Sequence, residues 1–153
     1  MPGSPVCSRA DAAAWPAAFE MTDWLGIPFV PHGRDYTGAD CYGLVRLFYA
    51  DVMGVHLPRL RGLVRDVGNP RETGPLMRGE AHGPLWRPVP DPAFGDILAF
   101  GTPALFTHVG IYLRPGLMLH TRTGTDSTPE RYDSPIWQPR LQGFFRYKDF
   151  SYA

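Results

Sequence analysis

Four short runs of residues that favour β-strands occupy the C-terminal half of the chain, and they constrain the fold more than any other feature. They are 95–101 (GDILAFG), 105–113 (LFTHVGIYL), 116–122 (GLMLHTR) and 143–150 (GFFRYKDF). Turn residues separate the runs, and 114–116 (RPG) predicts a three-residue hairpin loop between the second run and the third. The sequence therefore predicts an antiparallel sheet in this half of the chain.

A helix is predicted between Asp40 and Gly54. Asp40 is a good N-cap because its carboxylate can accept hydrogen bonds from the free N–H groups of the first turn. Gly54 supplies a left-handed stop, and Pro58 prevents continuation. Apolar residues recur at three- and four-residue steps and mark one buried face: Leu44, Val45, Phe48 and Val52.

Two further helices are predicted, one over 16–25 that ends at Gly26 and a short one near 71–78. The first places Trp15, Phe19, Thr22 and Leu25 on one face. Helices then precede the sheet in the chain, which predicts an α+β architecture. Residues 1–14 are expected to form a flexible arm, and 15–153 a single domain.

Composition and charge exclude several classes of protein. The 153 residues are 44% hydrophobic and carry no formal net charge, so nothing predicts binding to nucleic acid or to an anionic membrane. No run approaches the eighteen or so apolar residues that a membrane span needs. The N-terminus lacks a basic leader and an apolar core, so we expect synthesis in the cytoplasm without a signal peptide. A disulfide between Cys7 and Cys41 is disfavoured in that reducing compartment.

Cys41 lies at the first turn of the predicted helix, directly after Asp40. The helix dipole favours a thiolate there, whereas the charge of Asp40 opposes it. A net gain in reactivity requires a further partner, most naturally a histidine. Alternatively, Cys41 is a small buried hydrophobic residue, as free cysteines commonly are.

Two histidines share one face of the predicted hairpin. If Leu113 pairs with Leu117 across the loop, His120 lies opposite Gly110 and diagonal to His108. Gly110 would leave room for an imidazole. A two-residue loop without a bulge would instead place His120 on the other face of the sheet.

The residues alone leave three interpretations of Cys41, His108 and His120. The two histidines can be structural residues bonded to the backbone. All three can be ligands of a metal ion, although they lack the local spacing typical of zinc sites. Finally, one imidazole can activate the cysteine while the second orients the first.

Four segments, in order, resemble the NlpC-type cell-wall cysteine peptidases over residues 21–147. They are TGADCYGLVRLFY, FGDILAF, THVGIYL and LMLHTRTG. The resemblance is strongest to the versions carried in tail tips of siphophages and gene transfer agents. It implies a papain-like α+β fold in which the nucleophile helix packs on an antiparallel sheet.

The resemblance also implies roles for individual residues. Cys41 would be the nucleophile, His108 the general base, and His120 the third polar residue that holds the His108 ring. Asp40 matches an acid that helps to bind the stem peptide in relatives, and it would cap the helix as well. Asp96 is interpreted as structural. Neither a metal nor an organic cofactor is implied.

One position departs from the family pattern. Relatives often carry a tyrosine where this chain has Phe29, so oxyanion stabilisation would rely on backbone N–H groups around Cys41 or on another side chain. Tyr42 is interpreted as a packing residue. Three histidines match no motif position and are expected on the surface or in loops: His32, His56 and His82.

The implied function is cleavage of stem-peptide amide bonds in peptidoglycan, within a phage-like tail tip that opens the wall for DNA entry. The implied partners are the stem peptide and the hub or baseplate proteins of the tail. The alternative is a structural tail-tip component whose peptidase site is vestigial.

Overall fold

The computed structural model describes residues 15–58 and 70–150. The predicted arm over 1–14 and Cys7 lie outside the described residues. Within the described ranges, no helix is long and apolar enough to cross a membrane.

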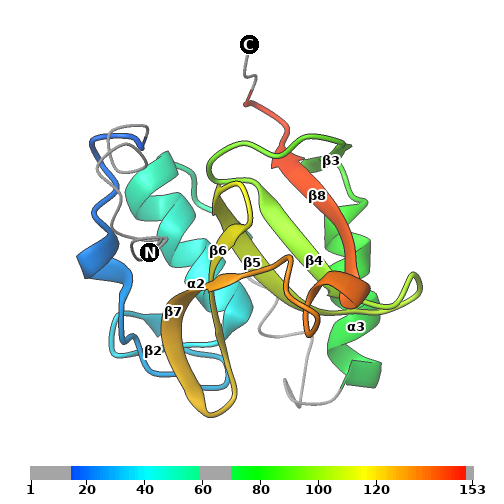
Figure 1. The fold of residues 1–153 in the computed structure, drawn as a ribbon, viewed down its shortest axis with the longest axis horizontal. Helices are drawn as coiled ribbons and strands as arrows, with labels where there is room; N and C mark the ends of the chain where they lie inside the picture. Colours follow the sequence, from blue (N-terminus) through cyan, green and yellow to red (C-terminus); the bar gives the residue numbers. More distant parts are fainter. Residues whose placement is uncertain (1–14, 59–69, 151–153) are drawn as a thin grey trace.

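A six-stranded antiparallel sheet forms the centre of the molecule (Figure 1). Its strands are β3 (Trp86–Val89), β4 (Ile97–Gly101), β5 (Phe106–Arg114), β6 (Leu117–Arg122), β7 (Thr125–Arg131) and β8 (Leu141–Tyr147). Their spatial order is β3-β8-β4-β5-β6-β7. The four predicted strands are therefore present as β4, β5, β6 and β8, whereas the edge strands β3 and β7 were not predicted.

The predicted nucleophile helix is α2 (Cys41–Phe48), which continues as the π-helical turn η2 (Tyr49–Met53). Gly54 ends it in the left-handed conformation, with φ of 74°. A small hairpin of β1 (Arg34–Asp35) and β2 (Gly38–Ala39) leads into α2. The predicted helix near 71–78 is α3 (Pro70–Ala81).

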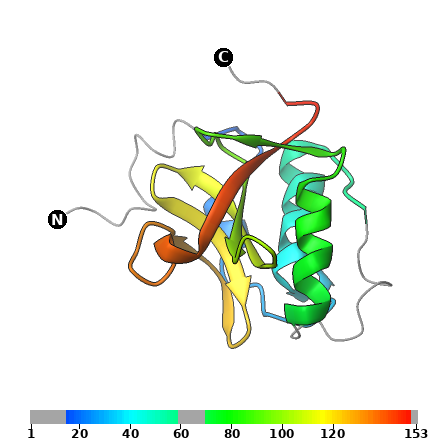
Figure 2. The ribbon, with the colours of Figure 1, turned by 90° about the vertical axis from the view of Figure 1, so that its right-hand side faces the viewer.

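Both α-helices pack on one face of the sheet, which confirms the α+β architecture. Figure 2 shows α2 and α3 side by side against the strands, and both contact β5. Because side chains alternate along a strand, one set from β4, β5 and β6 faces the helices. That set, with the helix residues that it meets, forms the main core: Leu44, Val45, Phe48, Ile97, Ala99, Ile111, Leu117 and Leu119.

The opposite face of the sheet carries a second, smaller cluster. It consists of Leu98, Phe100, Tyr112, Met118 and Trp137, with Tyr132, Leu141 and Phe144 packed against it. The segment between β7 and β8, which includes the short 3₁₀ helix η4 (Gln138–Arg140), covers this face. The histidines of β5 and β6 therefore share a sheet face with aromatic residues.

The predicted helix over 16–25 is wrong. Only the 3₁₀ turn η1 (Met21–Trp24) forms, and Leu25 is 47% exposed rather than buried. The reason is a tertiary contact. Ser127 of β7 accepts a hydrogen bond from the N–H of Ile27 and donates one to the carbonyl of Trp24, which satisfies backbone groups outside any helix.

The register of the β5–β6 hairpin agrees with the prediction along the strands and differs at the turn. Ile111 pairs with Leu119, as expected, but an irregularity pairs Leu117 with Arg114 instead of Leu113. The loop is thus Pro115 and Gly116, with a bulge that preserves the face of His120. The space beside Gly110 is taken by Met118, not by an imidazole.

Candidate active site

Cys41 begins α2 and lies against strand β5. It is buried, and backbone N–H groups of Val109 and Tyr42 bond to its sulfur and lower its pKa. Val109 directly follows His108, so the fold brings the start of α2 to the histidine-bearing part of β5. The structure thus joins two motifs that are 67 residues apart in the chain.

Asp40 fixes the start of α2 by accepting three hydrogen bonds. Its Oδ1 accepts from the N–H of Gly43 at 2.7 Å and from Arg34 Nη1 at 2.7 Å. Its Oδ2 accepts from the N–H of His32 at 3.0 Å. The predicted capping role is confirmed. Substrate contact remains a prediction, and it would compete with these bonds because the Asp40 side chain is only 2% exposed.

Gly43 allows the close packing of this helix start. A Cβ at this position would overlap the carbonyl oxygen of Gly33 and would lie 2.9 Å from Arg34 Nη1. His32, in the same loop, holds a left-handed φ of 62°, a conformation that is uncommon outside glycine. The loop before Cys41 is therefore held by backbone contacts to Asp40 and to the helix.

The predicted proximity of His108 and His120 is confirmed. The Nε2 atom of His108 lies 2.8 Å from Nδ1 of His120, and both rings are buried. The other nitrogen of His120, Nε2, lies 2.7 Å from Oε1 of Glu130 on β7. Trp137 stacks on the His108 ring, with ring centroids 5.0 Å apart and planes at 26°.

Glu130 and Trp137 were not predicted from the sequence. Met118 pairs with Glu130 in the β6–β7 ladder, which places Glu130 on the same face as His120 and diagonal to it. The available signal was the turn at Gly124, which adopts φ of 79° between the two strands. A hairpin prediction there would have brought Glu130 to His120, whereas nothing local indicated the position of Trp137.

Burial dominates the ionisation of the candidate catalytic pair. It raises the pKa of Cys41 to about 12, with the charge of Asp40 as the second cause. Burial also lowers the pKa of His108 well below its usual value, followed by the effects of His120 and Arg140. The predicted preference for thiolate from the helix dipole is therefore outweighed by burial. Burial therefore favours the neutral forms of both groups.

The remaining predicted residues have structural contacts. Asp96 forms a buried ion pair with Arg146 at 2.7 Å and accepts a hydrogen bond from the N–H of Ala93, which confirms its structural interpretation. The ring of Tyr42 is buried, and its hydroxyl donates to the carbonyl of Pro58 at 2.7 Å. Among the described residues, no group of three or more His, Cys, Asp or Glu side chains could hold a metal ion.

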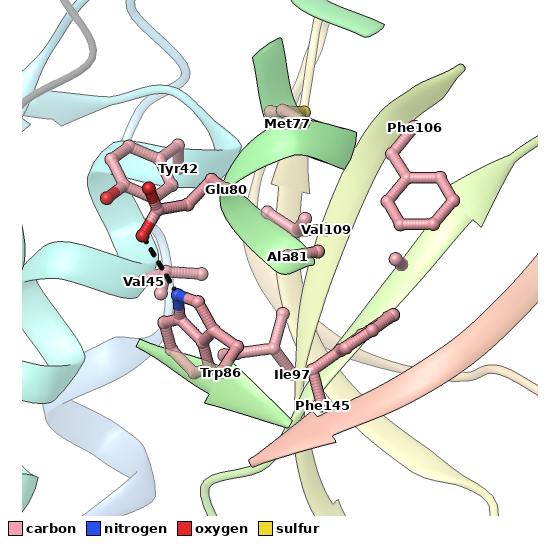
Figure 3. A pocket seen from close by; sticks show the side chains of 11 residues that line it. Tyr42, Val45, Met77, Glu80, Ala81, Trp86, Ile97, Phe106, Val109 and Phe145 are labelled. Atoms are coloured by element: carbon pink, nitrogen blue, oxygen red, sulfur yellow. Dashed lines mark hydrogen bonds between the residues drawn. The ribbon is translucent and has the colours of Figure 1, made fainter. Parts of the chain in front are cut away.

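An apolar pocket lies between α2, α3 and the sheet (Figure 3). Tyr42 and Val109, each one residue after a candidate catalytic residue, contribute to its wall. Its one carboxylate, Glu80, accepts a hydrogen bond from the indole of Trp86 at 3.0 Å. The other lining residues are Val45, Met77, Ala81, Ile97, Ala99, Phe106 and Phe145. The pocket can hold a small apolar group.

A second hollow, at the outer side of α2, is lined in part by basic side chains. Arg34, Arg46 and His56 line it together with Leu47, Ala50 and Leu57. Arg34 also contacts Asp40, so this hollow reaches the loop that precedes Cys41. The charge of Arg34 is paired there with that of Asp40.

Comparison with known proteins identifies relatives of this chain. The model of the NlpC/P60 family matches residues 26–146. The chain is 23% identical over 121 residues to the murein DD-endopeptidase MepS/murein LD-carboxypeptidase of Escherichia coli, covering 79% of this chain and 56% of the relative. It is 26% identical over 140 residues to murein DD-endopeptidase MepH of the same species, covering 89% and 46%. The chain thus spans about half the length of these relatives.

Solved structures share the fold. An NlpC/P60 family protein from Bacillus cereus superposes with a TM-score of 0.60 at 23% identity, covering 81% of this chain and 36% of that one. The NlpC/P60 domain of the peptidoglycan hydrolase SagA gives a TM-score of 0.51 at 25% identity, covering 81% and 89%.

Proposed function

Because this chain belongs to the NlpC/P60 family, we propose that it is a cysteine endopeptidase that cleaves amide bonds in the stem peptides of peptidoglycan. The observation that carries the proposal is the meeting of Cys41, at the start of α2, with the strand that bears His108 and its partner His120. The relatives MepS and MepH are named as murein endopeptidases, which supports the substrate class.

In the proposed reaction, the proton of the Cys41 thiol passes to His108, and the sulfur attacks the carbonyl carbon of the scissile amide. The tetrahedral intermediate collapses when the carbon–nitrogen bond breaks, and His108 returns the proton to the leaving amine. Water then attacks the thioester, His108 takes a proton from it, and the acyl group leaves as a carboxylic acid. The proton returns to the thiol, so no cofactor takes part.

Each of the two opposite pKa shifts reflects the cost of forming one buried charge alone. Burial penalises a lone thiolate at Cys41 and a lone imidazolium at His108. In the proposed reaction one proton moves from sulfur to nitrogen, so the thiolate and the imidazolium form together and each offsets the charge of the other. The pair therefore ionises as a unit.

The oxyanion would bind to a backbone N–H group at the start of α2. Phe29 forms a backbone bridge with Ala39 and is half-buried, but its ring has no donor. The N–H of Gly43 already donates to Asp40 and that of Tyr42 bonds to the Cys41 sulfur, so the oxyanion is assigned to the N–H of Cys41, at the positive end of the helix dipole.

The chain is further proposed to act within a phage-like tail tip, next to hub or baseplate proteins. The support is the resemblance of its motifs to tail-tip members of the family. Immunogold labelling of intact particles should place the protein at the distal end of the tail. Its presence in the periplasm of uninfected cells would contradict this location.

A structural tail-tip component with a vestigial site is the second candidate function, and Phe29 in place of tyrosine favours it. A zymogram on purified cell wall separates the two candidates. The proposed enzyme clears the gel, and mass spectrometry of the released fragments shows new stem-peptide termini. An intact wall after incubation with folded protein would favour the structural role.

A further inference from the structure

The carboxylate of Glu130 on β7 contacts His120, one of the two buried histidines, and Trp137, whose ring stacks on His108. Its Oε1 lies 2.7 Å from Nε2 of His120, and its Oε2 accepts a hydrogen bond from Nε1 of Trp137 at 2.9 Å. The Glu130 side chain is 33% exposed, whereas the His120 side chain is fully buried. The carboxylate therefore joins the surface of the protein to its buried histidines.

The hydrogen-bond chain assigns a proton to each ring. An ionised carboxylate can only accept, so Nε2 of His120 carries the proton that points to Glu130. Neutral His120 then has a bare Nδ1, which can only accept. Since Nε2 of His108 lies 2.8 Å from that atom, His108 must donate from Nε2. The free electron pair of His108 is consequently on Nδ1.

We propose that Glu130 is a positioning residue that sets the tautomers of both histidines and thereby presents Nδ1 of His108 as the basic nitrogen. The link to catalysis rests on the proposed function, in which His108 is the base. The relay runs from Glu130 through His120 to His108, and the residue at its surface end was not among the predicted site residues.

Trp137 adds a second reason for a carboxylate at this position. Its indole stacks on His108 and meets His120 edge-on, with centroids 5.2 Å apart. Glu130 holds the indole N–H at the same time as the His120 N–H, so two donors converge on two oxygens. Glutamine has one oxygen and one NH₂ group. Its oxygen can accept from only one of these two N–H groups, and its NH₂ group would then face the other N–H, so that two donors meet.

The charges around His120 act in opposite directions. Burial lowers its pKa, whereas the hydrogen bond and the charge of Glu130 raise it, and Arg122 lowers it. Burial first, and then the charges of His120, Arg140 and Arg122, lower the pKa of His108. Glu130 thus supplies the negative charge that favours an imidazolium in the pair. Without this carboxylate, the pKa of the pair falls, and the protonated form is lost at lower pH.

Long-range ¹H–¹⁵N correlation spectra test the tautomers directly, because they report which ring nitrogen carries the proton. In the wild-type protein, both histidines should be protonated at Nε2. In Glu130→Gln, the signals of His120 should shift toward the other tautomer or toward a mixture. Asp126→Asn, which changes an exposed carboxylate on the same strand, is the matched control and should leave the spectra unchanged.

A second variant keeps the test informative if Glu130→Gln disturbs packing. Trp137→Phe removes one of the two donors, so glutamine at position 130 could turn its oxygen to His120. The effect of Glu130→Gln on the tautomers should therefore shrink in the Trp137→Phe background, as a double-mutant cycle. Protonation of His120 at Nδ1 in the wild type, or the same tautomers with and without the carboxylate, would overturn the proposal.

Kinetic measurements extend the test to catalysis. Glu130→Gln should lower kcat on stem peptide on the order of 10- to 100-fold, as for other partners that orient a reacting group, with little change in KM. The acid limb of its pH–rate profile, where protonation of His108 removes the base, should move to lower pH. If the wild type cuts no peptide but its tautomers depend on Glu130, the proposed function fails while the tautomer assignment stands. Full activity with unchanged tautomers in Glu130→Gln would refute the inference alone.

Discussion

Replacing Asp40 with asparagine should lower the free energy of unfolding by about 3 to 5 kcal/mol and should also make Cys41 easier to ionise. Both effects have one origin. The Asp40 carboxylate is buried next to the sulfur, pairs with Arg34 and accepts backbone N–H groups from the loop and the helix. Asparagine keeps the shape of the side chain but removes its charge.

The magnitude follows from the burial of the ion pair. The Arg34 side chain is 12% exposed and that of Asp40 is 2% exposed, so solvent screens the pair little. Removing one partner of such a pair typically costs about 3 to 5 kcal/mol because the remaining charge stays buried. Asparagine can still cap Gly43 through its oxygen. Its NH₂ group, however, faces donors from Arg34 or His32, and that conflict is part of the same cost.

Denaturant unfolding of the wild type, Asp40→Asn and Asp35→Asn measures the stability effect. Asp35 is an exposed carboxylate in the same loop and accepts hydrogen bonds from Thr37, so its variant is the matched control. The Asp40 variant should unfold at a clearly lower denaturant concentration than the control. Equal denaturation midpoints for the two variants would refute the argument that Asp40 and Arg34 form a buried ion pair.

The same variants test the electrostatic effect on the thiol. Asp40 raises the pKa of Cys41, and Arg34 lowers it. Without the aspartate charge, the pKa of Cys41 must fall, so the rate of iodoacetamide labelling should reach its half-maximum at lower pH than in the wild type. A profile that stays in place or moves to higher pH would contradict the assigned cause.

Three other substitutions have defined outcomes. Arg146→Leu should lower the free energy of unfolding by about 3 to 5 kcal/mol, because Asp96 then keeps a buried charge without its cation; a denaturation curve like that of the wild type would contradict this. Gly43→Ala should lower the thermal midpoint, since its methyl group overlaps the preceding loop, and an unchanged midpoint would show that the loop yields. His120→Asn should retain measurable peptidase activity, His120→Ala should retain less, and His108→Asn should retain almost none. Equal rates for the wild type and His120→Ala would remove His120 from the site.

The elements with strong local signals were predicted correctly. Asp40 lies at the start of α2 and Gly54 at the end of its continuation η2, as expected, since both positions have a specific chemical role at a helix end. The hairpin with His108 and His120 was predicted because a strand has a strict two-residue period, and the bulge at the turn preserved that period. These are features that neighbouring residues in the chain determine.

The missed elements depend on contacts between distant segments. β7 contains Pro129 and several polar residues, and it forms a strand because it lies at the edge of the sheet, where proline is tolerated. The segment before Gly26 has a helical pattern, yet Ser127 of β7 satisfies its backbone groups instead. Trp137 reaches His108 only through the connection between β7 and β8. In each case, a partner far along the chain overrides the local preference.

Hydrolysis of purified peptidoglycan by the wild type and by Cys41→Ser tests the central claim most directly. Release of new amino termini from the stem peptides would be measured by mass spectrometry, and circular dichroism would establish that both proteins are folded. The account predicts steady release by the wild type and almost none by Cys41→Ser, because a serine hydroxyl is a far weaker nucleophile than a thiolate. Full activity of Cys41→Ser, or no release by the folded wild type, would contradict it.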